Sequence, residues 1–337
     1  MIFQYESKYL YLQVGKLSEQ LKYSGKLDVG ILGKACLSGL EKNSLKSYKS
    51  KFNAWKNFAV QNCLDIFPVN IIEFKVFLCM RIQEGACWST INSTISALKF
   101  FNKILHIDQV IDFEPSFVAY LKKFSRNPNK RRRPLTKDEF DSVFQFFGKQ
   151  YVKDFEIARS LCILSFSYLG FLRYDDISQI KLCDVGLQGK IVKMNISQAK
   201  NDYEKKGQSV QFELSESMFD IFSFYLAHAN FSKQDWQSQE KFLFFHVTKN
   251  GKKKFEKSLQ YDDMRYIVLC MCQKAGVNIT RLGTHSLRIG ATSHATRLGV
   301  PDKVIDAHGG WAEGSRARQG YQRVNWEDLS VISKVLK

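Results

Sequence analysis

The chain has 337 residues, a formal net charge of +17 and 45% hydrophobic residues. This much apolar material excludes a disordered chain, and the length suggests two domains of ordinary size. The excess positive charge favours nucleic acid as a partner, because neutralising phosphates releases counterions. No apolar run reaches the roughly 18 residues of a membrane span, and the first residues contain no signal core. We therefore expect an intracellular protein with no membrane partner.

The eight cysteines form no CxxC pair, and most of them lie within apolar helical patterns. This distribution predicts reduced core thiols rather than disulfides or zinc ligands. No Walker A loop and no carboxylate cluster suited to Mg²⁺ is present, so we expect no cofactor and no metal.

The first third of the chain is predicted to be helical. Apolar residues follow helical spacing in residues 43–63. A capping box of Asn70 and Glu73 predicts the start of a second helix. A third helix is expected to begin near Ser89, and a fourth is opened by Pro115.

A basic segment, SRNPNKRRRP, follows these helices, and residues 115–137 contain no acid. We interpret it as an interdomain linker, with domains at residues 1–133 and 134–337. A basic connector is well placed to cross phosphates, which predicts contacts to the DNA backbone. The alternatives are a solvated loop or a nuclear import signal. The residues expected to contact DNA are Lys130, Arg131, Arg132 and Arg133.

The second domain is predicted to be mostly helical with a small antiparallel sheet, so the fold class is mainly α. Thr136 and Glu139 form a second capping box. The expected elements are a helix at 154–169, a hairpin of strands 189–197 and 208–213, a helix at 215–229, a short strand at 242–247, and helices punctuated by glycine from residue 261 onwards.

The segment THSLRIGA carries the strongest local signal. Thr284 is a good N-cap, which places His285 and Arg288 in the first turns of one helix, on a shared face. A helix N-terminus favours anions, and the pair supplies a permanent cation and an imidazole that can move protons. These features predict a phosphate site. Alone, the same pattern also fits two ordinary surface residues.

The segment LGFLRYDDI contains a second candidate. Arg173 is expected to end a long apolar helix, where a charged group must face a partner or a cleft. Asp176, three residues later, could support it. A surface arginine at a helix C-terminus is the alternative.

Three further candidates are weak individually. Lys200 is placed at the tip of the predicted hairpin, where an ordinary solvated lysine is equally common, and Lys205 and Lys206 are close rivals. Trp311 follows two glycines, and Tyr321 lies ten residues further on in the segment GYQR. A tryptophan or tyrosine in such positions is more often structural.

Together, these residues resemble the tyrosine recombinase family of phage-type integrases, nearest to its Cre-like and eukaryotic mobile-element branches. The resemblance rests on the segments LGFLR–DDI, THSLRIGAT and GGWAEG…GYQR, and on the order of Arg173, Lys200, His285, Arg288, Trp311 and Tyr321. Three departures stand out. The separation from Trp311 to Tyr321 is about one residue longer than usual, Ile289 stands where many bacterial members carry histidine, and Trp311 replaces the commoner histidine.

The resemblance implies two domains that clamp double-stranded DNA and assemble as a tetramer on paired sites. It also implies a final helix, with an apolar stripe of Trp326, Leu329, Ile332 and Val335, that docks on a neighbouring subunit. In a eukaryotic host the protein would work in the nucleus, and otherwise in the cytoplasm or nucleoid.

The family's chemistry assigns a role to each residue. Tyr321 would attack the scissile phosphate to give a 3′-phosphotyrosine, and Arg173 and Arg288 would hold the non-bridging oxygens. His285 would act as the base or as a proton relay, and Trp311 would donate a hydrogen bond to the phosphate. The proton for the departing 5′-oxygen would come from the hairpin lysine, Lys200.

Three other functions remain open at this point. A type IB topoisomerase uses nearly the same residues and only relaxes DNA. A domesticated, inactive DNA-binding protein would keep the charge without the chemistry. A structural DNA scaffold would carry these residues by coincidence.

Overall fold

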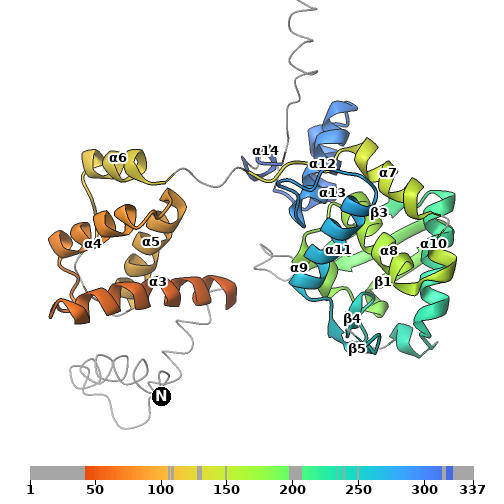
Figure 1. The fold of residues 1–337 in the computed structure, drawn as a ribbon, viewed down its shortest axis with the longest axis horizontal. Coiled ribbons are helices and arrows are strands. Elements are labelled where there is room, and N and C mark those ends of the chain that lie inside the picture. Colours follow the sequence, from red (N-terminus) through yellow and green to blue (C-terminus); the bar gives the residue numbers. More distant parts are fainter. Residues whose placement is uncertain are drawn as a thin grey trace, which may run out of the picture. The chain divides into compact units, whose positions relative to one another are not determined.

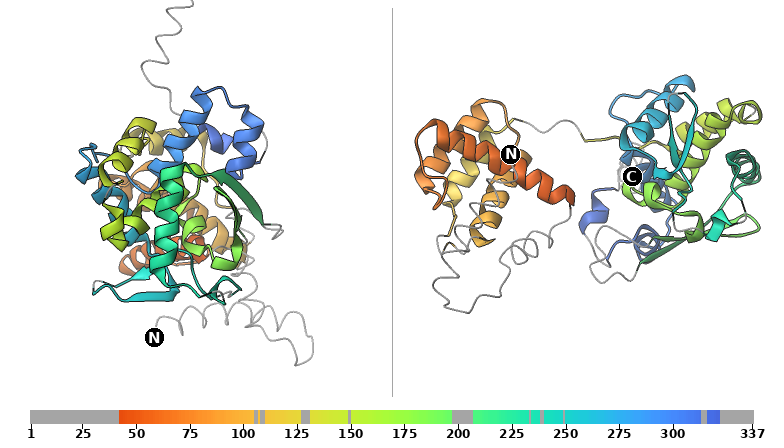
Figure 2. Two further views of the ribbon diagram at one scale, coloured as in Figure 1. Left: turned by 90° about the vertical axis from the view of Figure 1, so that its right-hand side faces the viewer. Right: turned by 90° about the horizontal axis from the view of Figure 1, so that it is seen from below.

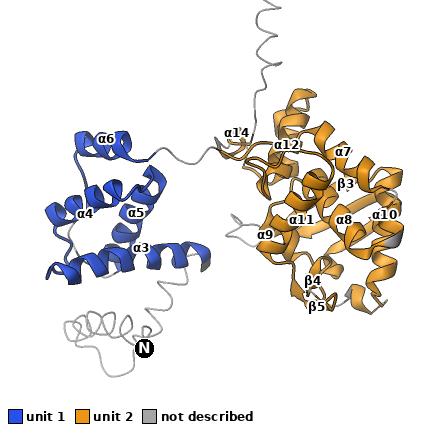
Figure 3. Ribbon diagram, viewed as in Figure 1, with its two compact units in different colours: residues 1–129 blue, residues 130–337 orange. Residues whose placement is uncertain are grey.

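The structure is a computed structural model that describes residues 42–104, 107, 110–126, 131–148, 150–196, 207–232, 234–237, 240–248, 250–312 and 316–321. The chain divides into two compact units between residues 129 and 130, as Figure 3 shows. The basic residues 131–133 therefore fall in the second unit. Within the described ranges, no helix combines the length and apolar character needed to cross a bilayer.

The first unit is helical, as the apolar periodicity predicts (Figure 1). Asn70 begins the second of its helices, because its side-chain oxygen accepts the N–H groups of Ile72 and Glu73 at 2.9 and 3.4 Å. The described helices are α3 (Lys42–Gln61), α4 (Ile71–Gln83), α5 (Trp88–Ile104) and α6 (Pro115–Phe124).

An aromatic cluster forms the core of the first unit. Trp55 is fully buried and meets Phe74 and Phe77 edge to face, with ring centroids 5.3 and 5.5 Å apart. Its indole N–H donates to the carbonyl of Ile66 at 3.1 Å, so burying this polar group leaves no unpaired donor. The helical pattern of residues 43–63 therefore places its tryptophan at the centre of the unit.

The second unit combines helices with two small antiparallel sheets (Figures 1 and 2). Its described elements are α7 (Lys137–Phe147), η1 (Tyr151–Lys153), α8 (Phe155–Leu169), α9 (Tyr174–Gln179), η2 (Leu182–Asp184), β1 (Val185–Gln188), β2 (Ile191–Ile196), β3 (Gln208–Glu213), α10 (Glu216–Ala229), η3 (Asp235–Gln237), β4 (Phe245–Val247), β5 (Lys253–Ser258), α11 (Tyr261–Lys274), α12 (His285–Arg297), α13 (Asp302–Gly309) and α14 (Arg316–Gln319).

The predicted hairpin is confirmed, since β2 and β3 pair antiparallel with Met194 opposite Val210. Two strands were not predicted from the sequence. Strand β1 extends this sheet to the order β1-β2-β3, and β5 pairs with β4. Both omissions have a physical reason. Three of the four residues of β1 are exposed, and β5 reads KKFEKS, so neither shows the apolar alternation that identifies a strand.

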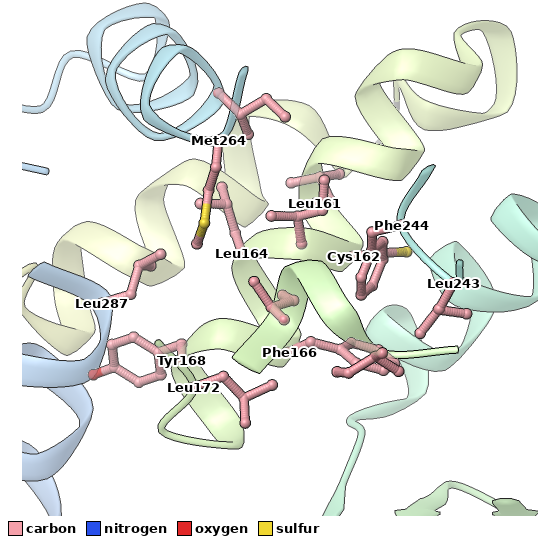
Figure 4. Close-up of a cluster of buried hydrophobic side chains, with 14 of the residues drawn as sticks. Leu161, Cys162, Leu164, Phe166, Tyr168, Leu172, Leu243, Phe244, Met264 and Leu287 are labelled. Atoms are coloured by element: carbon pink, nitrogen blue, oxygen red, sulfur yellow. The ribbon is translucent and has the colours of Figure 1, made fainter. Parts of the chain in front are cut away.

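Helix α8 lies at the centre of this unit and packs against α10, α11 and α12. Its residues from Ala158 to Tyr168 are all buried, so the helix is covered on every side by other elements. Figure 4 shows Leu161, Leu164 and Phe166 of α8 among side chains from other elements, including Met264 of α11 and Leu287 of α12. The helix that precedes Arg173 is thus fixed in the core.

The expectation of core thiols holds for only some of the cysteines. Cys162 and Cys272 are buried, whereas Cys63 and Cys183 are exposed. Cys63 follows the end of α3 with a φ of 54°, and Cys183 lies on the short 3-10 turn η2, so neither position faces the core. Cys36 lies outside the described residues.

Candidate active site

Arg288 is the most deeply buried of the expected catalytic residues, with 1% of its surface exposed. Its guanidinium donates to the carbonyl of Phe171, and Nη2 donates to the carbonyl of Gly309 at 2.6 Å. These bonds join α12 to the turn after α8 and to the end of α13. Because a guanidinium has five N–H groups, the two bonds leave three to meet other acceptors.

The start of α12 differs from the expected cap. Thr284 precedes the helix, but it already has helical backbone angles and its side chain makes no capping bond. Instead the hydroxyl of Ser286 accepts the N–H of Gly283 at 3.0 Å. The prediction of a Thr284 cap is therefore wrong, while His285 and Arg288 do lie in the first turns of the helix.

Arg173 does not end the long apolar helix, as the sequence led us to expect. Helix α8 ends at Leu169, a turn with Phe171 at a φ of 50° follows, and Arg173 is the N-cap residue of α9. The backbone N–H of Arg173 donates to Asp176 Oδ2 at 2.8 Å, and its Nη1 lies 3.7 Å from the same oxygen. Asp176 thus holds both the backbone and the guanidinium of Arg173.

The two arginines create a strongly electropositive environment. Burial, followed by the nearby charge of Arg173, lowers the pKa of Arg288 to about 9. Desolvation and a like charge both disfavour the cation, whereas an added anion would favour it. Arg288 remains protonated at neutral pH, so the two neighbouring guanidinium groups are suited to a phosphate.

Trp311 packs against Arg288 from the segment after α13. The guanidinium carbon lies 4.0 Å from the centroid of the indole ring, a cation–π contact. The ring is 8% exposed, and its Nε1 is buried without a hydrogen-bond partner among the described residues, as is Arg288 Nε. A buried donor without an acceptor is costly, so two such donors in contacting side chains indicate a site that takes up an acceptor.

The glycines before Trp311 make this packing possible. A Cβ atom on Gly309 would lie 1.9 Å from the Trp311 ring, and one on Gly310 would lie 2.0 Å from the side chain of Gln208. Gly310 also has a φ of +63°, a conformation that glycine adopts without strain. The GGW segment is therefore a steric requirement for placing the indole against Arg288.

Tyr321 completes the cluster from the residues after α14. Its ring centroid lies 5.4 Å from that of Trp311 and 6.4 Å from that of His285, and the guanidinium carbon of Arg288 lies 5.2 Å from it. Its backbone carbonyl accepts the hydroxyl of Ser293 of α12 at 3.0 Å. The structure thus gathers His285, Arg288, Trp311 and Tyr321, with Arg173 close enough to perturb Arg288.

Some expected residues cannot be placed. Lys200 and its rivals Lys205 and Lys206 lie outside the described residues, as do Lys130 and the final helix with its apolar stripe. Their roles stay predictions. Arg131 is described and is exposed.

The other two arginines of the basic segment are engaged within the second unit. Arg133 Nη1 donates to Glu139 Oε2 at 2.8 Å, and its Nε donates to the carbonyl of Thr280 at 3.2 Å. Arg132 Nη1 donates to the carbonyl of Leu282 at 2.8 Å. These two side chains fasten the segment to the chain before α12, whereas the exposed Arg131 is left facing solvent.

The half-buried His308 was given no role of its own in the sequence-based prediction. His308 Nε2 donates to the carbonyl of Leu169 at 2.7 Å, and its ring meets Phe171 edge to face at 4.7 Å. Its backbone carbonyl accepts Gln208 Nε2 at 3.2 Å. His308 therefore supports the turn that leads to Arg173. Its position directly before the GGW segment was the only sequence signal for this role.

In the part of the chain that the structure describes, no group of three or more His, Cys, Asp or Glu side chains is arranged to hold a metal ion. The site consists instead of cationic, aromatic and imidazole groups around Arg288. This set suits the binding of a phosphate diester and attack on it by a phenol.

The chain belongs to the phage integrase family, whose model matches residues 130–327, more than half of the chain. The match begins where the second compact unit begins. The resemblance to tyrosine recombinases is confirmed, and with it membership of a class of enzymes that break and rejoin DNA.

Relatives and solved structures agree with this family. The tyrosine recombinase XerD of Proteus mirabilis is 20% identical over 294 residues, which cover 87% of each chain. The Tn1549 transposon integrase in complex with transposon right-end DNA has a TM-score of 0.61 at 12% identity, covering 97% of this chain and 98% of that chain. The XerH site-specific recombinase, in a post-cleavage complex with a palindromic difH substrate, has a TM-score of 0.58 at 14% identity, covering 87% and 78%. The predicted, mainly α fold with small antiparallel sheets is confirmed.

Proposed function

We propose that this chain is a site-specific DNA recombinase that cuts and rejoins double-stranded DNA through a transient bond to Tyr321. The observation that carries the proposal is the cluster of Arg288, Trp311 and Tyr321, in which Arg288 Nε and Trp311 Nε1 are buried without acceptors among the described residues. A scissile phosphate supplies the oxygens that these donors lack.

The phosphate is held by groups that the fold has already oriented. Arg288 offers the N–H groups that do not bond to Phe171 and Gly309, Arg173 adds a second guanidinium, and Trp311 adds one N–H. Such preorganised donors stabilise the charge that develops on the non-bridging oxygens during attack. Because α12 begins beside them, its N-terminus also favours the anion.

The chemistry is a direct displacement at phosphorus. The Tyr321 oxygen forms a bond to phosphorus, the bond from phosphorus to the 5′-oxygen breaks, and His285 accepts the phenolic proton. Lys200 donates a proton to the departing 5′-oxygen, which leaves as a hydroxyl. The phosphotyrosine retains the ester bond, so attack by a 5′-hydroxyl of another strand rejoins DNA without an external energy source.

We further propose that four copies assemble on two paired DNA sites, each copy contacting DNA with both of its domains. The predicted final helix, outside the described residues, would dock on a neighbouring copy. The substrate places the enzyme with the host's DNA, in the nucleus of a eukaryotic host and otherwise in the cytoplasm or nucleoid.

Covalent capture tests the proposal. The substrates are duplexes made from the DNA that flanks the gene, with a nick one or two nucleotides from candidate cleavage positions so that the cut fragment diffuses away. We expect a protein–DNA adduct that survives denaturation, and peptide mapping should place the nucleotide on Tyr321. No adduct on any flanking duplex, or an adduct at another residue, contradicts the proposal.

A second assay separates recombination from its alternatives. Two duplexes that carry the same site, one of them labelled, are incubated with the enzyme. Exchange of the label between duplexes is the expected outcome. Relaxation of supercoiled DNA without exchange would indicate a type IB topoisomerase, and binding without an adduct would indicate a domesticated or structural DNA-binding protein.

A further inference from the structure

The segment that carries Tyr321 needs contacts from elsewhere to hold its position. Helix α14 spans only Arg316–Gln319, and a helix this short is not stable by itself in water. Tyr321 follows it after one residue, Gly320, so the orientation of α14 determines where the phenol lies.

Arg318 connects α14 to α13. Its side chain is 11% exposed, and its two terminal nitrogens donate to both carboxylate oxygens of Asp302 at 2.7 and 2.6 Å. Its Nε also lies 2.8 Å from Oδ1 of the buried Asp306, as an ion pair without hydrogen-bond alignment. The two parallel bonds to Asp302 fix a direction as well as a distance, which a lysine cannot do.

The two acidic partners lie four residues apart on α13 and hence on one face of it. Asp306 also reaches the active site through its backbone, because its carbonyl accepts the N–H of Trp311 at 2.9 Å. At the other end of the ion pair, the backbone carbonyl of Arg318 accepts the N–H of Tyr321 at 2.8 Å. One ion-pair cluster thus connects directly to the backbones of Trp311 and Tyr321.

We propose that Arg318, Asp302 and Asp306 form a latch that sets the position of Tyr321 for attack. This inference rests on the proposed function and adds a positioning residue to it. Arg318 does not touch the phosphate. It acts through Tyr321, by docking α14 on the helix that leads into the GGW segment. Since a displacement of about 1 Å can cost about 10²-fold in rate, loss of the latch should slow cleavage strongly.

Single-turnover cleavage of the nicked duplex at saturating enzyme tests the latch. Arg318→Gln should lower the maximal rate by about 10- to 100-fold and leave the half-saturating enzyme concentration within about twofold of wild type, because positioning is lost and DNA binding is not. Lys190→Gln is the matched control, since Lys190 pairs with Glu216 on the exposed surface of the same unit. It should cleave like wild type.

Arg318→Gln leaves the buried Asp306 without its partner, which could destabilise the fold. Exchanging the charges of Arg318 and Asp302 distinguishes such misfolding from loss of the latch. Arg318→Glu alone should cleave even more slowly than Arg318→Gln. Adding Asp302→Arg restores an opposite charge that can pair with both residue 318 and Asp306. We expect the double variant to cleave at least about tenfold faster than Arg318→Glu. A purely steric role of Arg318 predicts no such recovery.

Hydrogen exchange gives a readout that is independent of cleavage. In Arg318→Gln the amides of residues 317–321 should exchange faster, while those of α12 stay as protected as in wild type. If wild type forms no adduct, the proposed function fails. If wild type cleaves and Arg318→Gln cleaves equally fast, only the latch is wrong. Uniformly faster exchange across the second unit would also overturn it, because the rate loss would then reflect unfolding.

Discussion

The proposed phosphate site around Arg288 and the segment that carries Tyr321, the proposed nucleophile, are held in different ways. Arg288 is 1% exposed and bonds to the backbone of two other segments, so the core of the second unit fixes it. Tyr321 is only partly buried and follows a four-residue helix held by Arg318 and by a hydroxyl of α12. The fold therefore determines where the guanidinium of Arg288 lies, whereas a few side-chain contacts determine where the phenol of Tyr321 lies.

This difference predicts different consequences of mutation. Changes at Arg288 should reduce both stability and cleavage, because its side chain bonds to two backbone segments of the core and is proposed to hold the phosphate. Changes in the nucleophile segment should reduce cleavage alone. The first two experiments below each test one side of this contrast.

The largest effect is expected for Tyr321→Phe, which removes one oxygen and retains the ring. The variant should form no covalent adduct on the nicked duplex, while DNA affinity and the thermal unfolding midpoint stay near those of wild type. Gel analysis under denaturing conditions measures the adduct, and Tyr266→Phe, at an exposed tyrosine of α11, is the matched control. A Tyr321→Phe protein that still captures DNA would show that another residue attacks.

On the pocket side, Arg288→Lys keeps the charge but loses the planar fork. We expect cleavage to fall by about 10²-fold or more, the cost of removing one preorganised donor. The unfolding midpoint should fall as well, because lysine cannot bond to both carbonyls that Arg288 reaches. Arg173→Lys should slow cleavage similarly with a smaller loss of stability, since its backbone bond to Asp176 remains. If both variants cleave at rates within a few-fold of wild type, neither arginine stabilises the transition state.

Much of this site could be predicted from the sequence because it depends on residue types at fixed local spacings. His285 and Arg288 share a helix face, and the glycines before Trp311 lie within two residues of it. Such relations survive without knowledge of the tertiary structure. The two predicted capping boxes are local in the same sense. The box of Thr136 and Glu139 is confirmed with both of its bonds, and at Asn70 the bonds that its side chain accepts are confirmed.

The remaining features depend on distant segments that meet only in the fold. Nothing local predicts that Arg318 meets Asp302, or that Gln208 of β3 meets the backbone of His308. The turn at Phe171 was missed because a positive φ at a bulky residue is set by its surroundings, here His308 and Arg288. The acidic pair on one face of α13 was the one signal that could have indicated the latch.

Lys200 provides a third test. It concerns the proton that is transferred to the departing 5′-oxygen, which we propose comes from Lys200. Lys200→Ala should slow cleavage of normal DNA by about 10²-fold, the lower range for a general acid. With sulfur in place of the bridging 5′-oxygen it should cleave nearly as fast as wild type, because a thiolate leaves without a proton.

The comparison variants for this test sharpen it. Arg288→Ala should stay impaired on the sulfur substrate, since the phosphate charge still needs its donors. Lys205→Ala and Lys206→Ala should be mild on both substrates. Rescue of either of these two variants instead of Lys200→Ala would move the assignment to that lysine, and rescue of none would place the acid elsewhere.

The basic segment also contains one exposed and one hydrogen-bonded arginine, Arg131 and Arg133, which should respond differently to mutation. Arg131→Gln should weaken binding to all DNA sequences by a few-fold and reduce the slope of log affinity against log salt by about 1, as expected for one lost phosphate contact. Arg133→Gln should instead lower the unfolding midpoint, since its bonds to Glu139 and Thr280 hold the segment in place. An unchanged salt slope for Arg131→Gln would contradict its contact with DNA.

The smallest expected effect concerns the acid sensitivity of the pocket. Burial lowers the pKa of His308 below its ordinary value of 6.5, and the charge of Arg288 acts in the same direction. The folded state thus favours the neutral imidazole, so its contribution to stability is complete above about pH 6.5 and is lost as the pH falls through the lowered pKa. His308→Gln keeps a donor for the carbonyl of Leu169 and removes the titration.

The free energy of unfolding, measured by urea between pH 7.5 and pH 5, should therefore decline less steeply for His308→Gln than for wild type. His294→Gln is the comparison variant, because burial and nearby Arg297 lower the pKa of His294 at a position away from Arg288. His308 and Arg288 both bond to the segment Leu169–Phe171. We therefore expect the cleavage rate of wild type to fall together with its stability as the pH is lowered, and that of His308→Gln to fall less. Equal slopes for wild type and His308→Gln would show that His308 does not link protonation to the pocket.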